Sequence, residues 1–143
     1  RQSMVKLRKP KARAPSEHRI QQDIRLALGQ ESDLVLWRNH RGKVMAETDE
    51  GYRFAGVAGL GDGGADLVGV LRIRICLEAG EDPETIYIGR FFALEVKRPG
   101  QKPESHQLQW GELVRKFGGF YAVVDSVDAA RLALGRARKG ETL

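Results

Sequence analysis

Two long strand patterns joined by a short polar turn constrain the fold of this chain more than any other feature. Residues 66–77 alternate apolar and polar side chains at their far end, and residues 85–97 are mostly apolar. Alternation is typical of a strand with one buried face, whereas a mostly apolar run is typical of a strand at the centre of a sheet. Residues 79–83 form the polar turn between them. We therefore expect one long antiparallel hairpin, whose tip projects as an arm that could bind DNA or another subunit.

Charged residues stand at the base of this hairpin. Glu95 and Lys97 lie two residues apart near the end of the second strand, so their side chains point to the same face. Leu94 and Val96 point the other way, into a core. Asp66 stands at the start of the first strand. An acid on one strand beside an acid–x–lysine on the next is the minimum set that holds a divalent metal ion next to a phosphodiester, and the Val96 carbonyl is a candidate third ligand. The alternative is a surface ion pair on a strand.

Two predicted helices add polar residues near this base. Residues 16–28 predict a first helix whose inward stripe includes Glu17, and residues 104–117 predict a second helix that carries Gln107 on its apolar face. Gln107 could orient the attacking water or the substrate. Glu17 either completes the metal shell or is an acid favoured by the helix dipole. The apolar residues that share the face of the second helix are Trp110, Leu113, Val114 and Phe117.

The order of the predicted elements indicates one α/β domain. A short strand is expected at residues 33–39, and a buried strand at residues 120–125 precedes a last helix at residues 127–138. Residues 40–58 are expected to be loops around short extended pieces, because glycines interrupt them. The passage from strand 85–97 through a helix to strand 120–125 predicts a parallel pair. We therefore expect a mixed β-sheet flanked by helices, in the order α-β-β-β-α-β-α, with the long hairpin as an extension.

Charge and composition favour a nucleic-acid partner. The 143-residue chain carries a net charge of +5 and has a pI of about 9.6, which suits a polyanionic partner, although a solvated basic surface is the alternative. Residues 1–15 are basic and poor in large apolar side chains, so we expect a flexible arm, in which residues 1–3 are a cloning remnant ahead of Met4. Residues 16–143 are expected to form the single domain. A lone Cys76 and the lack of a membrane-length apolar run favour the cytoplasm.

Basic and polar residues around the hairpin base are candidate contacts to the DNA backbone, although each could equally be a solvated surface residue. They are Arg38, Asn39, Arg41, Lys43, Arg53, Arg98 and Lys102. The glycine-rich turn at residues 59–64 lacks a Walker lysine and a following helix, so a nucleotide-binding P-loop is a poor fit. No Ser/His/Asp arrangement is visible, which argues against covalent catalysis.

Four segments, taken as a set, resemble the VRR-NUC family of PD-(D/E)xK nucleases. They are Glu17, Gly64-Ala65-Asp66-Leu67, Glu95-Val96-Lys97 and Gln107-Leu108-Gln109-Trp110. The similarity runs from Ser16 to Leu134. Stand-alone members from phages and bacteria are also similar at Trp37-Arg38-Asn39 and Gly118-Gly119-Phe120. One departure is Ala65, where the superfamily pattern has proline; this position shapes the turn and is not a ligand.

The resemblance implies a restriction-endonuclease-like core, metal ligation by Asp66 and Glu95, and a catalytic Lys97, with supporting roles for Glu17 and Gln107. It also implies dependence on Mg²⁺ or Mn²⁺ and action on branched DNA, such as Holliday junctions, by a homodimer. The sequence thus predicts a metal-dependent, structure-selective DNA endonuclease. Two alternatives stay open. One is a nuclease for flap or linear duplex DNA within a larger repair, restriction or packaging system, and the other is a non-catalytic DNA-binding module.

Overall fold

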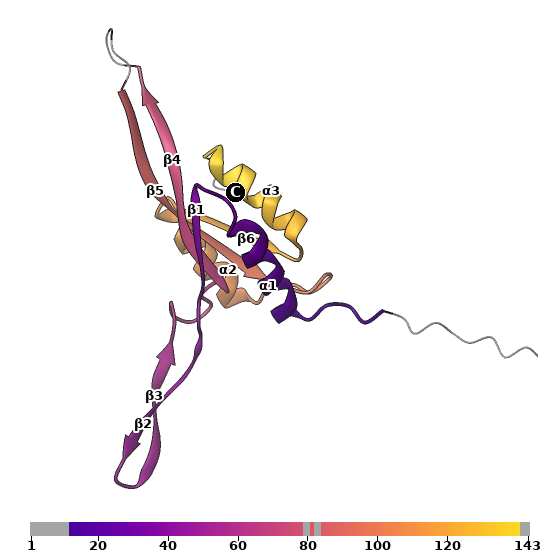
Figure 1. Ribbon diagram of the computed structural model, residues 1–143. Helices are drawn as coiled ribbons and strands as arrows, with labels where there is room; N and C mark the ends of the chain where they lie inside the picture. Colours follow the sequence, from indigo (N-terminus) through magenta and orange to yellow (C-terminus); the bar gives the residue numbers. More distant parts are fainter. Residues whose placement is uncertain (1–11, 79–80, 82–83, 141–143) are drawn as a thin grey trace, which may run out of the picture.

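Three helices, a four-stranded sheet and a separate two-stranded ribbon make up this computed structural model, which describes residues 12–78, 81 and 84–140 (Figure 1). In chain order the elements are α1 (Glu17–Leu28), β1 (Leu34–Arg38), β2 (Gly42–Thr48), β3 (Gly51–Ala58), β4 (Leu67–Leu77), β5 (Glu84–Val96), α2 (Ser105–Lys116), β6 (Phe120–Val124) and α3 (Val127–Arg138). Most of the predicted basic arm, residues 1–11, lies outside the described residues, and residues 12–15 are exposed.

The four-stranded sheet has the order β1-β4-β5-β6 and is mixed, as the sequence predicts. Strand β4 pairs antiparallel with both β1 and β5, whereas β6 returns through α2 to lie parallel to β5. The expected parallel pair is therefore confirmed. The register opposes Leu67 to Leu94, which places Asp66, the residue before β4, beside the end of β5.

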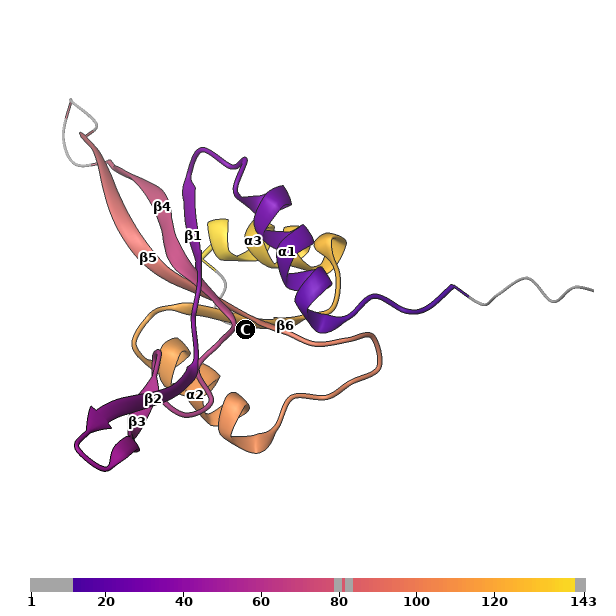
Figure 2. The same cartoon turned by 60° about the horizontal axis from the view of Figure 1, so that its bottom comes forward.

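The helices cover the two faces of this sheet unequally (Figure 2). Helices α1 and α3 pack on one face, where Leu94 and Val96 are fully buried among the residues of the main core. Helix α2 packs on the other face, against Ala93 and Tyr121. Because side chains alternate along a strand, Glu95 points to the α2 face. Among the described residues, no helix has both the length and the apolar character needed to cross a membrane.

The expectation of loops at residues 40–58 is wrong, and so is the predicted element order, which lacks two strands. Strands β2 and β3 form an antiparallel ribbon that projects from the body of the molecule (Figure 1). Its glycines lie at the turn and at a bulge of the ribbon and do not interrupt the strands. Gly51, with a φ of 114°, closes the turn, and Gly56, with a φ of 151°, lies at the bulge where the register shifts. Such φ values favour glycine, so the glycines mark a turn and a bulge.

The long hairpin of β4 and β5 is confirmed, and its outer half is a second projection. The two strands pair from Leu67, which lies opposite Leu94, to Leu77, which lies opposite Glu84. Pairing with β1 ends at Leu71 and pairing with β6 begins only at Phe92, so no strand of the described residues flanks the outer half. In Figure 1 this projection and the β2–β3 ribbon point away from each other.

Candidate active site

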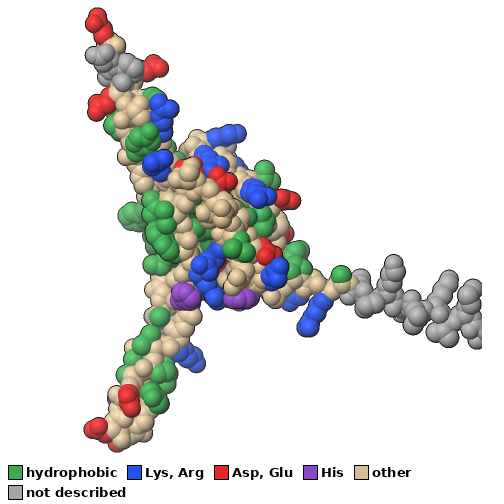
Figure 3. All heavy atoms as spheres, viewed as in Figure 1, with side chains coloured by type: hydrophobic (Ala, Val, Ile, Leu, Met, Phe, Trp, Pro, Cys, Tyr) green, Lys and Arg blue, Asp and Glu red, His purple; other side chains and the backbone are tan. Residues whose placement is uncertain are grey.

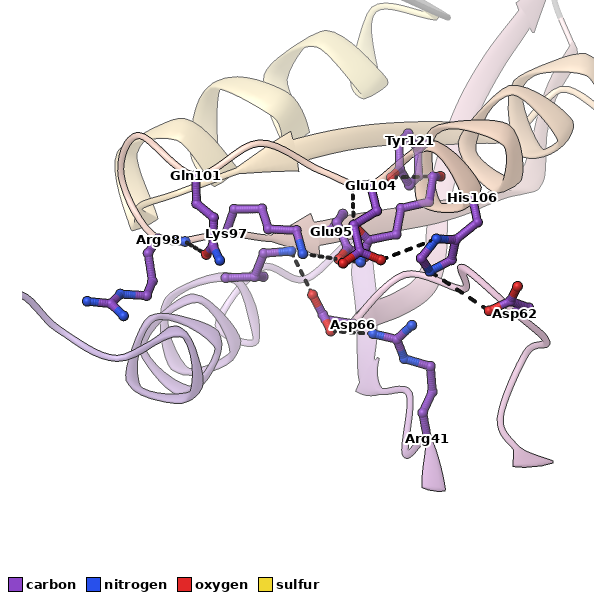
Figure 4. Close-up of polar contacts among 12 residues, drawn as sticks. Arg41, Asp62, Asp66, Glu95, Lys97, Arg98, Gln101, Glu104, His106 and Tyr121 are labelled. Atoms are coloured by element: carbon purple, nitrogen blue, oxygen red, sulfur yellow. Dashed lines mark hydrogen bonds and ion pairs between the residues drawn. The ribbon is translucent and has the colours of Figure 1, made fainter. Parts of the chain in front are cut away.

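Four of the polar side chains singled out from the sequence meet at the base of the hairpin (Figure 4). They are Asp66, Glu95 and Lys97, which Figure 4 labels, and Gln107, whose side-chain amide donates to Glu95. All four are buried, and among the described residues the only other buried polar side chain is that of Gln21. Burying charged groups costs free energy unless they are paired or bind an ion, so such a concentration marks a site.

Asp66 is held against the end of β5 by its carboxylate. Its Oδ2 accepts a hydrogen bond of 2.8 Å from the Val96 backbone N–H, and its Oδ1 accepts one of 3.2 Å from the Arg41 guanidinium. The N–H and C=O of one strand residue point to the same side of the strand. The Val96 carbonyl therefore lies on the side of Asp66, as its predicted role as a third ligand requires.

Glu95 is fully buried, and its two oxygens have different surroundings. Its Oε1 accepts a hydrogen bond from the Gln107 side-chain amide and lies 3.3 Å from the Lys97 Nζ. Its Oε2 has no hydrogen-bond partner among the described residues. Burial and, to a smaller extent, the negative charge of Asp66 raise the pKa of Glu95 from 4.5 to about 7, although Lys97 and Arg41 oppose the rise. The unpartnered oxygen can therefore be satisfied by a proton or by a cation.

Gln107 is oriented by its place in the first turn of α2. Its Oε1 accepts a 2.8 Å hydrogen bond from the Glu104 backbone N–H, so its amide nitrogen faces Glu95. The Tyr121 hydroxyl donates to the Gln107 carbonyl at 3.1 Å. A side chain at Gly111 would run into the Tyr121 ring, so this glycine lets α2 approach β6 closely. Sequence reasoning missed Tyr121; its hydroxyl within an apolar strand is the signal that could have found it.

The glycine-rich turn at residues 59–64 packs against the first two turns of α2. The Trp110 indole N–H donates to the Leu60 carbonyl at 3.1 Å, and a Cβ at Gly63 would collide with the His106 backbone. His106 itself lies 3.8 Å from a carboxylate oxygen of Asp62 (Figure 4). The glycines of this turn thus let the backbone that leads into Asp66 lie close to α2.

Glu17 stays a prediction. It begins α1, which packs on the face of the sheet opposite α2, and within the described residues no hydrogen bond or ion pair joins it to the other candidates. Its position in the first turn, after the Ser16 cap, is also where an acid interacts favourably with the helix dipole. Gln21, one turn further along α1, is buried and was not singled out from the sequence.

The predicted DNA contacts separate into two groups. Asn39 and Arg41 reach the site: the Asn39 side chain donates to the Ala65 carbonyl at 3.0 Å, and Arg41 pairs with Asp66. The sequence indicated neither contact. The others are exposed or half-buried, and among the described residues no hydrogen bond or ion pair joins them to the four buried side chains. They are Arg38 at the end of β1, Lys43 and Arg53 on the ribbon, and Arg98 and Lys102 after β5.

Comparison with known proteins assigns no family to this chain. No protein-family model matches it, and no curated protein does.

Proposed function

We propose that the chain is a metal-dependent DNA endonuclease, with a restriction-endonuclease-like fold and a place in the VRR-NUC family that it resembles. One observation carries the proposal. A fully buried carboxylate, Glu95, has one oxygen without a partner among the described residues, and it lies beside a second buried carboxylate, Asp66. A protein that only binds DNA needs positive charge at its surface, and gains nothing from burying two acids next to a lysine.

The donor set fits Mg²⁺ or Mn²⁺. Within the part of the chain that is described, no group of three or more His, Cys, Asp or Glu side chains could hold a metal ion. Mg²⁺ is commonly bound by one or two carboxylates, with water and substrate phosphates completing the shell. Asp66, Glu95 and the Val96 carbonyl match that requirement. When bound there, the ion would neutralise phosphate charge and lower the pKa of a bound water.

The chain's own residues supply the remaining functions. Lys97 stands 3.3 Å from Glu95, where its ammonium group can hold the attacking water or stabilise charge that develops on the phosphate. Gln107 keeps the Glu95 carboxylate in a fixed orientation. Arg41 is half-buried against Asp66, and it can exchange this carboxylate for a DNA phosphate when substrate arrives.

The substrate we propose is branched DNA cut by a homodimer. A four-way junction requires paired nicks, and a domain with one site needs a second copy to make them. Flap or linear duplex DNA is the alternative substrate. A comparison of labelled junction, flap, duplex and single-stranded DNA, each with Mg²⁺ or Mn²⁺, separates the two.

The decisive assay compares the wild type with Lys97→Ala and Asp66→Asn on the labelled four-way junction. We expect metal-dependent cleavage by the wild type and a loss of about 100-fold or more in both variants, since each removes a group that acts in the transition state. Lys139→Ala, an exposed lysine at the C-terminal end of α3, is the matched control and should retain cleavage. Cleavage that neither site variant diminishes would overturn the proposal. DNA binding that EDTA does not change, with no product under either metal, would identify a non-catalytic binding module instead.

A further inference from the structure

The β2–β3 ribbon exposes an apolar face that no other described part of the chain covers. Met45 lies opposite Phe54 across the ribbon and Glu47 lies opposite Tyr52, so the three apolar side chains share one face. All three are exposed, and Phe54 retains 57% of its surface. Among the described residues, strands β2 and β3 make their main contacts with each other and no extensive contact with a helix or the four-stranded sheet. Because an isolated two-stranded ribbon is marginally stable in water, this one needs a partner surface.

The body of the molecule exposes a second apolar surface, on the α2 face of the sheet. Val35, Val70 and Phe91 oppose one another across β1, β4 and β5, and all three are exposed. Helix α2 extends this surface, because Leu113 and Phe117 of its apolar face are exposed instead of buried. A shallow groove connects the two parts. Its lining includes Leu60, Phe91, Trp110, Leu113 and Phe117.

The ribbon cannot fold back onto this surface of its own chain, because it leads away from the body in both views (Figures 1 and 2). Its charge also disfavours a DNA groove as its partner. Residues 42–58 hold two basic side chains against three acidic ones, and the acids Asp49 and Glu50 lie at the tip (Figure 3). Acids at the tip would be repelled by phosphates. A protein surface with apolar and basic groups is the better match.

We propose that the partner is a second copy of this chain, and that the ribbon of each protomer packs across the exposed β4–β5 surface of the other. The two projections point away from each other, so a two-fold axis beside the body pairs each ribbon with the partner's long hairpin. The inference names the contact surface of the homodimer in the proposed function and rests on that part of it.

Length and charge agree with this arrangement. An eight-residue strand such as β3 spans about 23 Å, and β4 from Val68 to Arg74 spans about 20 Å. A ribbon laid along β4 from the body outward therefore brings its acidic tip to Arg72 and Arg74, which are exposed on the α2 face. The footprint of a ribbon of two strands is about 25 by 10 Å, so two docked ribbons bury about 1,000 Å² in total. That is near the lower limit for a specific interface, and Leu113 and Phe117 add to it.

Sedimentation analysis of the full chain tests the inference without metal or DNA. We expect a dimer for the wild type and a dissociation constant raised about tenfold or more by Phe54→Ser, because Phe54 would be a central buried anchor. Leu132→Ser is the matched control, since Leu132 is also a large exposed apolar residue but lies on α3, on the opposite face. It should leave the dimer intact.

Exchanging the charges of a proposed contact pair tests the interface in a way that a folding defect cannot imitate. Glu50→Lys and Arg74→Glu should each weaken the dimer, and the double variant should recover at least part of the loss, since the pair is restored with reversed sign. A monomeric wild type at high micromolar concentration, or an unchanged mass for Phe54→Ser, would overturn the inference. So would a Phe54→Ser variant that loses DNA affinity but not its mass, which would make the ribbon a DNA arm. Because mass is measured here, a failure of the cleavage assay leaves this result unaffected.

Discussion

Replacing Glu95 by glutamine should stabilise the metal-free protein at alkaline pH. The amide has the shape of the carboxylate, and its carbonyl oxygen still accepts the hydrogen bond that Gln107 donates. What it lacks is the negative charge, which is buried beside Asp66 and leaves one oxygen without a partner. The change therefore removes the cost of a buried charge while it keeps the local packing.

The size and pH window of the effect follow from the pKa of Glu95. Folding raises this pKa from 4.5 to about 7, so the folded state binds a proton that the unfolded state releases between these values. The free energy of unfolding of the wild type therefore falls as pH rises through this window. One pKa unit corresponds to about 1.4 kcal/mol, so the loss amounts to about 3 kcal/mol above pH 7. Glu95→Gln lacks this dependence and should be more stable than the wild type at pH 8 by up to that amount.

Urea unfolding in EDTA between pH 5 and pH 8 measures this difference. Glu112→Gln, on the exposed side of α2, is the control and should follow the wild type within about 0.5 kcal/mol. Asp33 does not interfere, because its side-chain hydrogen bond with Arg138 lowers its pKa below 3.8, outside the window. A variant that is less stable than the wild type at pH 8, or that keeps the same pH slope, would refute the reasoning. Adding Mg²⁺ at pH 8 should then stabilise the wild type and not Glu95→Gln.

Two further predictions concern neighbours of the site. Arg41→Gln should bind Mn²⁺ about fivefold more tightly in calorimetry without DNA, because it frees Asp66 from an ion pair worth about 1 kcal/mol. The same variant should bind DNA more weakly. An unchanged affinity for Mn²⁺ would contradict the proposed exchange of partners by Arg41. Gly111→Ala should destabilise the fold by about 1–3 kcal/mol through its clash with Tyr121, whereas Gly135→Ala, with open space around it in α3, should stabilise it by about 0.5–1 kcal/mol in the same thermal melts. The same sign for both glycine variants would show that contact with Tyr121 does not decide the outcome.

Local patterns predicted most of what the site contains. Alternation along β5 was enough to put Glu95 and Lys97 on one face, and the apolar run around them indicated a central strand. Helical spacing put Gln107 on the α2 face that meets the sheet. These features depend on residues only a few positions apart, so the sequence alone determines them.

Contacts between distant segments were not predicted. The Arg41 ion pair with Asp66 spans 25 residues, and the Tyr121 hydrogen bond to the Gln107 carbonyl spans 14. Each depends on how closely two elements approach, which no local pattern encodes. The ribbon was missed for a related reason: a glycine that ends one element and a glycine that turns a hairpin look the same in the sequence. The exposure of Phe117 was also hidden, because an apolar helix face does not reveal which chain covers it.

Two of the places where the described residues leave a physical requirement unmet are physically separate. One is the unpartnered oxygen of Glu95, and the other is the uncovered apolar face that includes Phe54 on the ribbon. Such departures are expected where a fold is completed by something other than itself. If a cation completes the Glu95 site and a second copy of the chain covers the ribbon, a single substitution should be able to abolish one of these features without the other. Phe54→Ser should then dissociate the dimer and keep the pH dependence that Glu95 imposes, whereas Glu95→Gln should do the reverse. A variant that abolished both would show that the dimer contact and the site are coupled.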